Sequence, residues 1–162
     1  MREAELYAPM VRGAADEGWV LFHPQEGAAK APFDLCGVVT AYVTFGGRDA
    51  AMRAVGVAVA CEVKLVDRQP REGEFPWRLL EAHQRTWIET YAGAGSVSLV
   101  ALCGPAHDMV VYVVGPGPVV VGSAPLEWRR LPDRFTGWGT ILSLWAARAP
   151  SEAKAGGADS PQ

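Results

Sequence analysis

The sequence predicts an α/β fold in which helices flank a mixed central β-sheet. Three observations support this class: strand-like and helix-like apolar runs follow one another along the chain, no apolar run is long enough to cross a membrane, and 49% of the 162 residues are hydrophobic against 20% charged. This composition is typical of one globular domain. We therefore expect a single domain over residues 1–149 and a disordered tail over residues 150–162.

The first elements predicted are a helix and a short strand. Residues 2–16 place Leu6, Met10 and Ala14 at a spacing of four, which is typical of an amphipathic helix. Residues 19–22 then suit a short strand.

Two long apolar runs predict the central strands. Residues 33–45 are dense in Val, Thr, Tyr and Phe, and residues 55–66 form a second run. The simplest arrangement makes the two runs antiparallel neighbours. The connection over residues 48–53 is longer than a tight turn, so we expect an extended hairpin.

Pro76 is expected to open a helix that Gly93 and Gly95 end. Apolar side chains recur at helical spacing between these limits, and on this pattern His83 belongs to the buried face. The expected buried face consists of Leu79, Leu80, His83, Trp87 and Tyr91.

The last third of the chain predicts further strands and a closing helix. Residues 97–103 and 109–114 are two β-type runs on either side of a Gly-Pro turn, and residues 119–121 add a short piece. Residues 138–147 suit a helix. The whole pattern predicts a sheet of four or five strands with helices packed on it.

The charge and the cysteines restrict the environment of the protein. Fifteen Lys and Arg against 18 Asp and Glu give a net charge of −3, so contacts with nucleic acid must come from local basic patches. Cys36, Cys61 and Cys103 lie in apolar runs without CxxC spacing and are expected as buried free thiols of a reducing compartment. The N-terminal residues show no signal-peptide pattern, which favours a cytoplasmic location.

Ionisable residues interrupt one of the predicted strands. Glu62 and Lys64 lie two positions apart in an apolar run, so both side chains point to the same face. Asp34, at the start of the neighbouring strand, can approach Glu62. Two converging carboxylates favour a hard divalent cation, Mg²⁺ or Mn²⁺, and the lysine would orient a water molecule or stabilise developing phosphate charge. The alternative is a surface ion pair beside an aspartate that caps a turn.

The same residues resemble a known family. Asp34 followed by Glu62, Val63 and Lys64 resembles the D…(D/E)xK motif of the PD-(D/E)xK nuclease superfamily, and the surrounding pattern is similar to Holliday-junction resolvases of the archaeal and RecU-like types. The resemblance covers residues 3–103 in the family's order: an ExEL helix, a phrase ending in DLCG, the EVK strand, an EAHQ helix and a VSLVAL strand. It implies a restriction-endonuclease-like core.

The resemblance implies two further site residues. In such resolvases an acidic residue of the first helix joins the metal site, and helical geometry favours Glu3, on the face of Leu6 and Met10, over Glu5. Gln84, in the EAHQ helix, would hold the attacking water or a phosphate oxygen. The alternatives are a solvated glutamate near the terminus and a glutamine that only completes a helix face.

Basic residues around the motif are candidates for DNA contacts. They would bind backbone phosphates, which position a nucleic acid without reading its sequence. The alternative for each is ordinary solvated surface. The candidates are Lys30, Arg68, Arg71, Arg78 and Arg85.

The motif and the resemblance together predict a Mg²⁺-dependent endonuclease that resolves four-way (Holliday) junctions in DNA by paired symmetric cleavage. Two symmetric cuts imply a homodimer. The alternatives are a restriction- or repair-type endonuclease of the same fold and a non-catalytic DNA-binding or assembly protein. The predicted catalytic residues are Lys64, Glu62, Asp34 and Gln84, and the predicted metal ligands are Asp34, Glu62 and Glu3.

Overall fold

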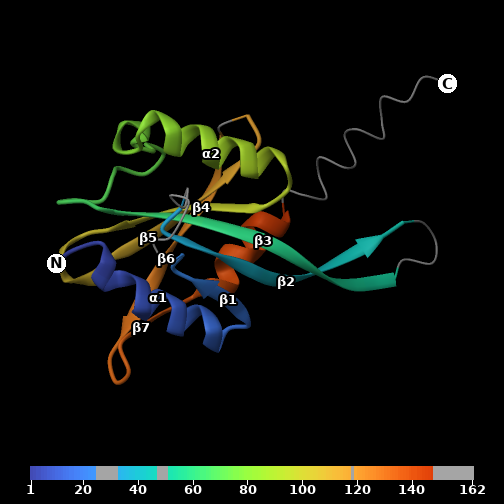
Figure 1. Ribbon diagram of the computed structural model, residues 1–162, viewed down its shortest axis with the longest axis horizontal. Helices are drawn as coiled ribbons and strands as arrows, with labels where there is room; N and C mark the ends of the chain where they lie inside the picture. Colours follow the sequence, from blue (N-terminus) through green and yellow to red (C-terminus); the bar gives the residue numbers. More distant parts are fainter. Residues whose placement is uncertain (25–32, 47–50, 118, 148–162) are drawn as a thin grey trace.

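The computed structural model describes residues 1–24, 33–46, 51–117 and 119–147 of the chain. Within these residues a seven-stranded mixed sheet has helices on both faces (Figure 1). The predicted class, an α/β fold with a mixed sheet flanked by helices, is confirmed. The predicted tail over residues 150–162 lies outside the described residues.

The first three strands form an antiparallel meander. β1 (Trp19–Phe22) pairs with β2 (Leu35–Phe45), and β2 pairs along its whole length with β3 (Ala51–Leu65). The predicted antiparallel hairpin is confirmed, but its second strand begins at Ala51 rather than at residue 55. The added residues have exposed side chains, so their apolar pattern is weak, and the backbone ladder with β2 makes them a strand.

A crossover helix connects β3 to a parallel neighbour. β4 (Val97–Cys103) lies beside β3 in parallel, and the connection contains a short 3₁₀ helix, η1 (Trp77–Leu79), and α2 (Ala82–Gly93). β4 is buried at every residue, as expected for a central strand whose two faces are both covered.

The remaining strands are antiparallel and more numerous than predicted. β5 (Met109–Gly115) pairs with β4, β6 (Val119–Arg129) with β5, and β7 (Arg134–Thr136) with β6. The predictions of four or five strands and of a short piece at residues 119–121 are wrong. Small residues and a proline interrupt the apolar run of β6, and β7 is too short for an alternating pattern.

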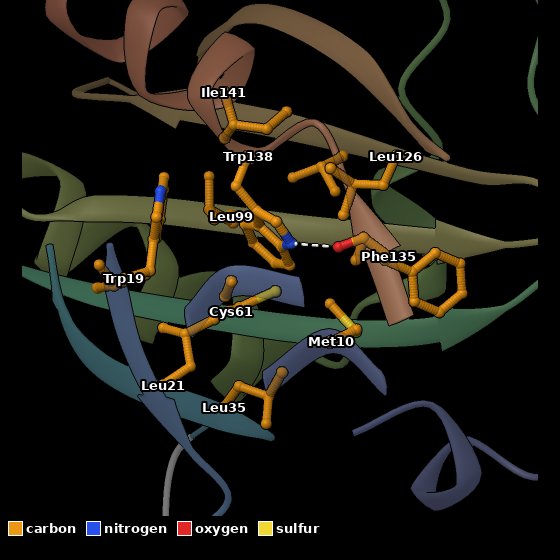
Figure 2. Close-up of a cluster of buried hydrophobic side chains, with 14 of the residues drawn as sticks. Met10, Trp19, Leu21, Leu35, Cys61, Leu99, Leu126, Phe135, Trp138 and Ile141 are labelled. Atoms are coloured by element: carbon orange, nitrogen blue, oxygen red, sulfur yellow. Dashed lines mark hydrogen bonds between the residues drawn. The ribbon is translucent and has the colours of Figure 1, made fainter. Parts of the chain in front are cut away.

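Alternate residues of the strands contribute to two separate cores. α1 (Ala4–Asp16) and the helical residues 138–147 pack on one face of the sheet, where the larger core lies (Figure 2). The prediction of a closing helix is thus confirmed. α2 and η1 cover part of the opposite face and enclose the smaller core (Figure 1). The smaller core consists of Phe33, Ala60, Leu80, Ile88, Val100, Leu102, Tyr112 and Val114.

A single carboxylate links α1 to the closing helix. Glu17 accepts hydrogen bonds from the backbone N–H groups of Gly137 (2.9 Å), Trp138 (3.0 Å) and Gly139 (3.1 Å). The first N–H groups of a helix have no partner within the helix, so Glu17 acts as their cap. The Trp138 ring then packs beside Trp19, with ring centroids 5.2 Å apart.

The predicted start of the second helix is wrong, and its predicted buried face is right only in part: Leu80 is buried and Tyr91 packs against the smaller core, whereas Trp87 is 42% exposed. The chain after Pro76 forms η1, and α2 begins only at Ala82. The buried side chains of α2 are Ile88 and Ala92. His83 is exposed and lies 3.2 Å from a Glu81 oxygen, so it is no core residue. The predicted apolar spacing includes residues that precede the helix, and this shifts the expected face.

All three cysteines are free thiols, as predicted. Cys61 and Cys103 are buried, whereas Cys36 is half-buried. Burial raises the pKa of Cys61, and with the charge of Asp108 it raises the pKa of Cys103 to about 11. These two thiols therefore stay protonated and pack as small apolar side chains.

Candidate functional site

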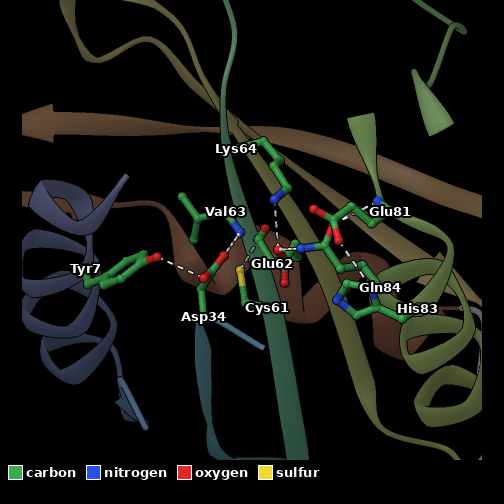
Figure 3. A network of polar contacts seen from close by, with 9 residues as sticks. All are labelled: Tyr7, Asp34, Cys61, Glu62, Val63, Lys64, Glu81, His83 and Gln84. Atoms are coloured by element: carbon green, nitrogen blue, oxygen red, sulfur yellow. Dashed lines mark hydrogen bonds and ion pairs between the residues drawn. The ribbon is translucent and has the colours of Figure 1, made fainter. Parts of the chain in front are cut away.

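The pairing of β2 with β3 brings Asp34 beside Glu62. Leu35 lies opposite Cys61, so Asp34, one residue earlier, lies at the level of Glu62. Oδ2 of Asp34 accepts a hydrogen bond from the backbone N–H of Val63 (2.8 Å; Figure 3). The first predicted carboxylate is thus attached directly to the strand that carries the second.

Glu62 and Lys64 project from the face of β3 that α2 partly covers (Figure 3). Nζ of Lys64 lies 3.0 Å from Oε1 of Glu62, and Nε2 of Gln84 donates a hydrogen bond to the same oxygen. The Glu62 side chain is 3% exposed and that of Lys64 is 19% exposed. Such burial argues against the alternative of a surface ion pair, since surface pairs keep their solvent.

Gln84 is held in place by the first turn of its own helix. Its Oε1 accepts a hydrogen bond from the backbone N–H of Glu81 (2.9 Å), which is part of a capping box at the start of α2. Its Nε2 is directed at Glu62. The oxygen and the nitrogen of the Gln84 amide therefore both have protein partners, and the amide holds the Glu62 side chain in place.

The electrostatics of the site depend on burial and on two adjacent carboxylates. Burial, together with the charge of Asp34, raises the pKa of Glu62 to about 7, although Lys64 acts in the opposite direction. Burial by itself would lower the pKa of Lys64, but the hydrogen bond and charge of Glu62, with the charges of Glu3 and Asp34, raise it. Lys64 is therefore a cation at neutral pH, next to a carboxyl group that titrates near neutrality.

Glu3, rather than Glu5, is near the site. Glu3 is the residue before α1, and its charge contributes to the raised pKa of both Tyr7 and Lys64. Glu5 instead forms an exposed ion pair with Arg2 (3.1 Å). The helical position that distinguishes the two glutamates in the sequence also distinguishes them in the structure.

Tyr7 and His23 belong to the site and were not predicted. The Tyr7 hydroxyl donates a hydrogen bond to Oδ1 of Asp34 (2.8 Å), and burial together with this bond raises the pKa of Tyr7. His23 stacks on the Tyr7 ring and donates from Nδ1 to the Asp34 carbonyl (2.6 Å). One sequence signal was present: Tyr7 lies four residues after Glu3, on the same side of the helix.

The donor set of the site fits a hard cation. Asp34 and Glu62 are oxygen donors whose mutual repulsion contributes to the raised pKa of Glu62, and a divalent cation between them would relieve it. Glu3 is the third carboxylate within electrostatic reach. Within the described part of the chain, no three acidic, histidine or cysteine side chains already converge closely enough to hold a metal ion. Glu3 would therefore have to move closer to complete such a set.

The predicted DNA-contact arginines lie between β3 and α2 or on α2. Arg68, Arg71, Arg78 and Arg85 all have exposed side chains. Arg85 lies over the ring of Trp77, with its guanidinium carbon 5.4 Å from the ring centroid. Lys30, the fifth predicted contact, lies outside the described residues.

A hollow of about 620 Å³ lies elsewhere, among β5, β6 and the end of β7. Gln69, Asp108 and Trp128 are among its lining residues. The predicted site residues do not line it. One face of the Trp128 ring is already stacked on His107, with ring centroids 4.0 Å apart. The hollow therefore adds nothing to the arrangement around Glu62.

Comparisons of the chain with protein-family models, with curated proteins and with solved structures find no significant match. Among the described residues, no helix has both the length and the apolar character needed to span a membrane.

Proposed function

We propose that this protein is a Mg²⁺-dependent, structure-selective endonuclease that resolves four-way (Holliday) junctions in DNA by paired symmetric cleavage in the cytoplasm. The observation that carries the proposal is the convergence of Asp34, Glu62 and Lys64. The two carboxylates come from neighbouring strands, and the ammonium lies 3.0 Å from a Glu62 oxygen. A resemblance stated on sequence order alone thus corresponds to one small group of side chains.

The order of elements supports a restriction-endonuclease-like core. The segments that resemble the resolvases are α1, the start of β2, β3, α2 and β4. β2, β3 and β4 are adjacent in the sheet, and α1 and α2 lie on opposite faces (Figure 1). The segments that carry the resemblance therefore form one contiguous half of the fold.

Each side chain has a role that its surroundings support. Asp34 and Glu62, with Glu3, would hold Mg²⁺, which supplies Lewis-acid activation of a water nucleophile when bound. Lys64 stays charged because Glu62 raises its pKa, so Nζ can orient the water or donate a hydrogen bond to a phosphate oxygen. Gln84 stabilises the charged form of Glu62 by donating to Oε1.

The exposed arginines support a nucleic-acid substrate. Arg68, Arg71, Arg78 and Arg85 belong to the segment between β3 and the middle of α2, which adjoins Lys64 and Gln84. Contacts from such residues to phosphates would position DNA by its shape. Recognition of a junction by shape needs contacts of this kind.

Cleavage of a labelled synthetic four-way junction tests the proposal. We expect paired symmetric nicks with Mg²⁺, none with EDTA, and little cutting of a linear duplex of the same sequence. Lys64→Ala should abolish cleavage. The matched control is Arg129→Ala, which removes a cation from an exposed ion pair with Glu127 and should leave cleavage unchanged.

The same experiment distinguishes the two alternatives. Metal-dependent cutting of the linear duplex as efficient as that of the junction would replace the resolvase with a restriction- or repair-type endonuclease. Junction binding without cleavage under any divalent cation would favour a non-catalytic DNA-binding protein. Full activity of Lys64→Ala would refute the site assignment.

A further inference from the structure

The face of the sheet that carries Glu62 and Lys64 continues beyond α2. Among the described residues, α2 packs on β3, β4 and β5 and leaves the β1–β2 side of this face uncovered. The register aligns alternate residues of β1, β2 and β3 on it. Large apolar side chains are exposed here. We call them the apolar face: Val20 (62% exposed), Phe22 (54%), Val38 (43%), Tyr42 (69%) and Met52 (70%).

The same strands extend beyond the rest of the sheet as a two-stranded arm. The pairing of β1 with β2 ends at Val39, and β4 pairs with β3 only from Val59 onward. Among the described residues, 40–45 and 51–56 therefore pair only with each other, and β3 has no neighbour on its other side before residue 59. The arm projects away from the sheet in Figure 1. A two-stranded ribbon is marginally stable by itself, and its two outer edges are open to further pairing.

The area of the apolar face is what an interface between proteins requires. Fully exposed aromatic side chains present about 150–250 Å², so the five side chains together present on the order of 500 Å². Apolar patches of monomeric proteins rarely exceed a few hundred Å², and a stable interface buries about 800 Å² on each partner. The open edges of the arm provide the additional area.

The charge of the face identifies the kind of partner. The alternate residues of β2 and β3 on this face, from Cys36 to Thr44 and from Met52 to Ala60, are uncharged. These residues offer no cation to a phosphate group, so the apolar face is poorly suited to binding nucleic acid. Two copies of a chain with a net charge of −3 could meet at this face without opposing like charges.

We propose that the apolar face and the arm form the interface with a second copy of this chain, related by a twofold axis. The same face of β3 continues from Ala58 to Glu62, four residues or about 13 Å, so each site would lie beside the interface and stay open to substrate. That the two sites act together on one junction rests on the proposed function. The dimer itself does not.

Sedimentation equilibrium of the full chain tests the interface. We expect the mass of a dimer for the wild type at micromolar concentration. Val20→Glu and Tyr42→Glu should each yield the monomer mass at the same concentration, because each would bury a charge in the interface. The dissociation constant of the dimer should rise at least tenfold. The matched control, Val119→Glu, alters a valine that is 51% exposed at the start of β6 and should remain dimeric.

The outcomes separate this proposal from the proposed function. A monomeric wild type overturns the interface, as do variants that stay dimeric or a control that dissociates equally. Circular dichroism establishes that each variant is folded. For the wild type alone, hydrogen exchange at two concentrations should show added protection at residues 51–58 in the more concentrated sample, and no change would count against the interface. A dimer that cuts no DNA would refute the nuclease and leave the interface intact.

Discussion

The two faces of the sheet are built differently. The face under α1 and the helical residues 138–147 is an apolar core that extends from Leu6 to Ile141. The opposite face has a smaller core, the buried carboxylate of Glu62 and an exposed apolar surface over β1 and β2. Burial of apolar area stabilises a fold, whereas a buried carboxylate costs free energy unless it is paired. We infer that the first face supplies stability and the second face supplies function.

The largest expected effect is on activity at the second face. Asp34→Asn keeps the shape of the side chain but removes a charge beside Glu62. It should lower the rate of the proposed DNA cleavage by about a thousandfold, or about 4 kcal/mol in activation free energy. The free energy of unfolding should change by only about 1 kcal/mol, since the amide retains one acceptor for Tyr7 or Val63. Single-turnover cleavage and urea denaturation measure the two quantities. A thousandfold loss that is matched by unfolding would contradict the division between faces.

A substitution in the core of the first face should lower the stability of the fold and leave activity nearly unchanged. Leu99 is fully buried in the larger core, so Leu99→Ala should lower the free energy of unfolding by about 3 kcal/mol through lost burial and a cavity. Cleavage per folded molecule should stay within twofold of the wild type at low temperature. Denaturation and active-site titration check this. A proportionate fall in specific activity would mean that the first face also shapes the site.

The pH dependence of stability should identify Glu62. Its pKa is about 7 in the folded protein against an ordinary 4.5, so between these values the folded protein binds more protons than the unfolded chain. The resulting stabilisation is complete below pH 4.5 and is lost as the pH rises through 7. Without divalent cations, the free energy of unfolding should therefore fall across this window by an amount on the order of 2 kcal/mol. Glu62→Gln should flatten the curve, and an unchanged slope would assign the titration to another group.

The smallest effect is expected at Tyr7. Tyr7→Phe removes the hydrogen bond to Oδ1 of Asp34 and keeps the ring that stacks on His23. We expect a cleavage rate lower by about tenfold at saturating Mg²⁺, equal to about 1.4 kcal/mol, with little change in the free energy of unfolding. A Mg²⁺ titration of the rate measures this. A rate equal to that of the wild type would mean that Asp34 needs no support from α1.

Local patterns predicted much of the fold and the central part of the site. Strand alternation places Glu62 and Lys64 on one face, and the antiparallel hairpin places Asp34 at the level of Glu62. The face of α2 was not predictable in this way. The predicted face continues the apolar spacing that starts at Leu79 and Leu80. The helix begins only after Leu80, and its own buried side chains are those of Ile88 and Ala92.

By itself, the sequence determined the α/β class, the order of the strands around the EVK triplet and the shared face of Glu62 and Lys64, because these follow from side-chain periodicity within one or two segments. Only the tertiary structure decided how deeply Glu62 is buried, that Gln84 holds its oxygen and that Tyr7 holds Asp34. Each of these depends on side chains more than twenty positions apart, which meet only after helices have packed on both faces of the sheet.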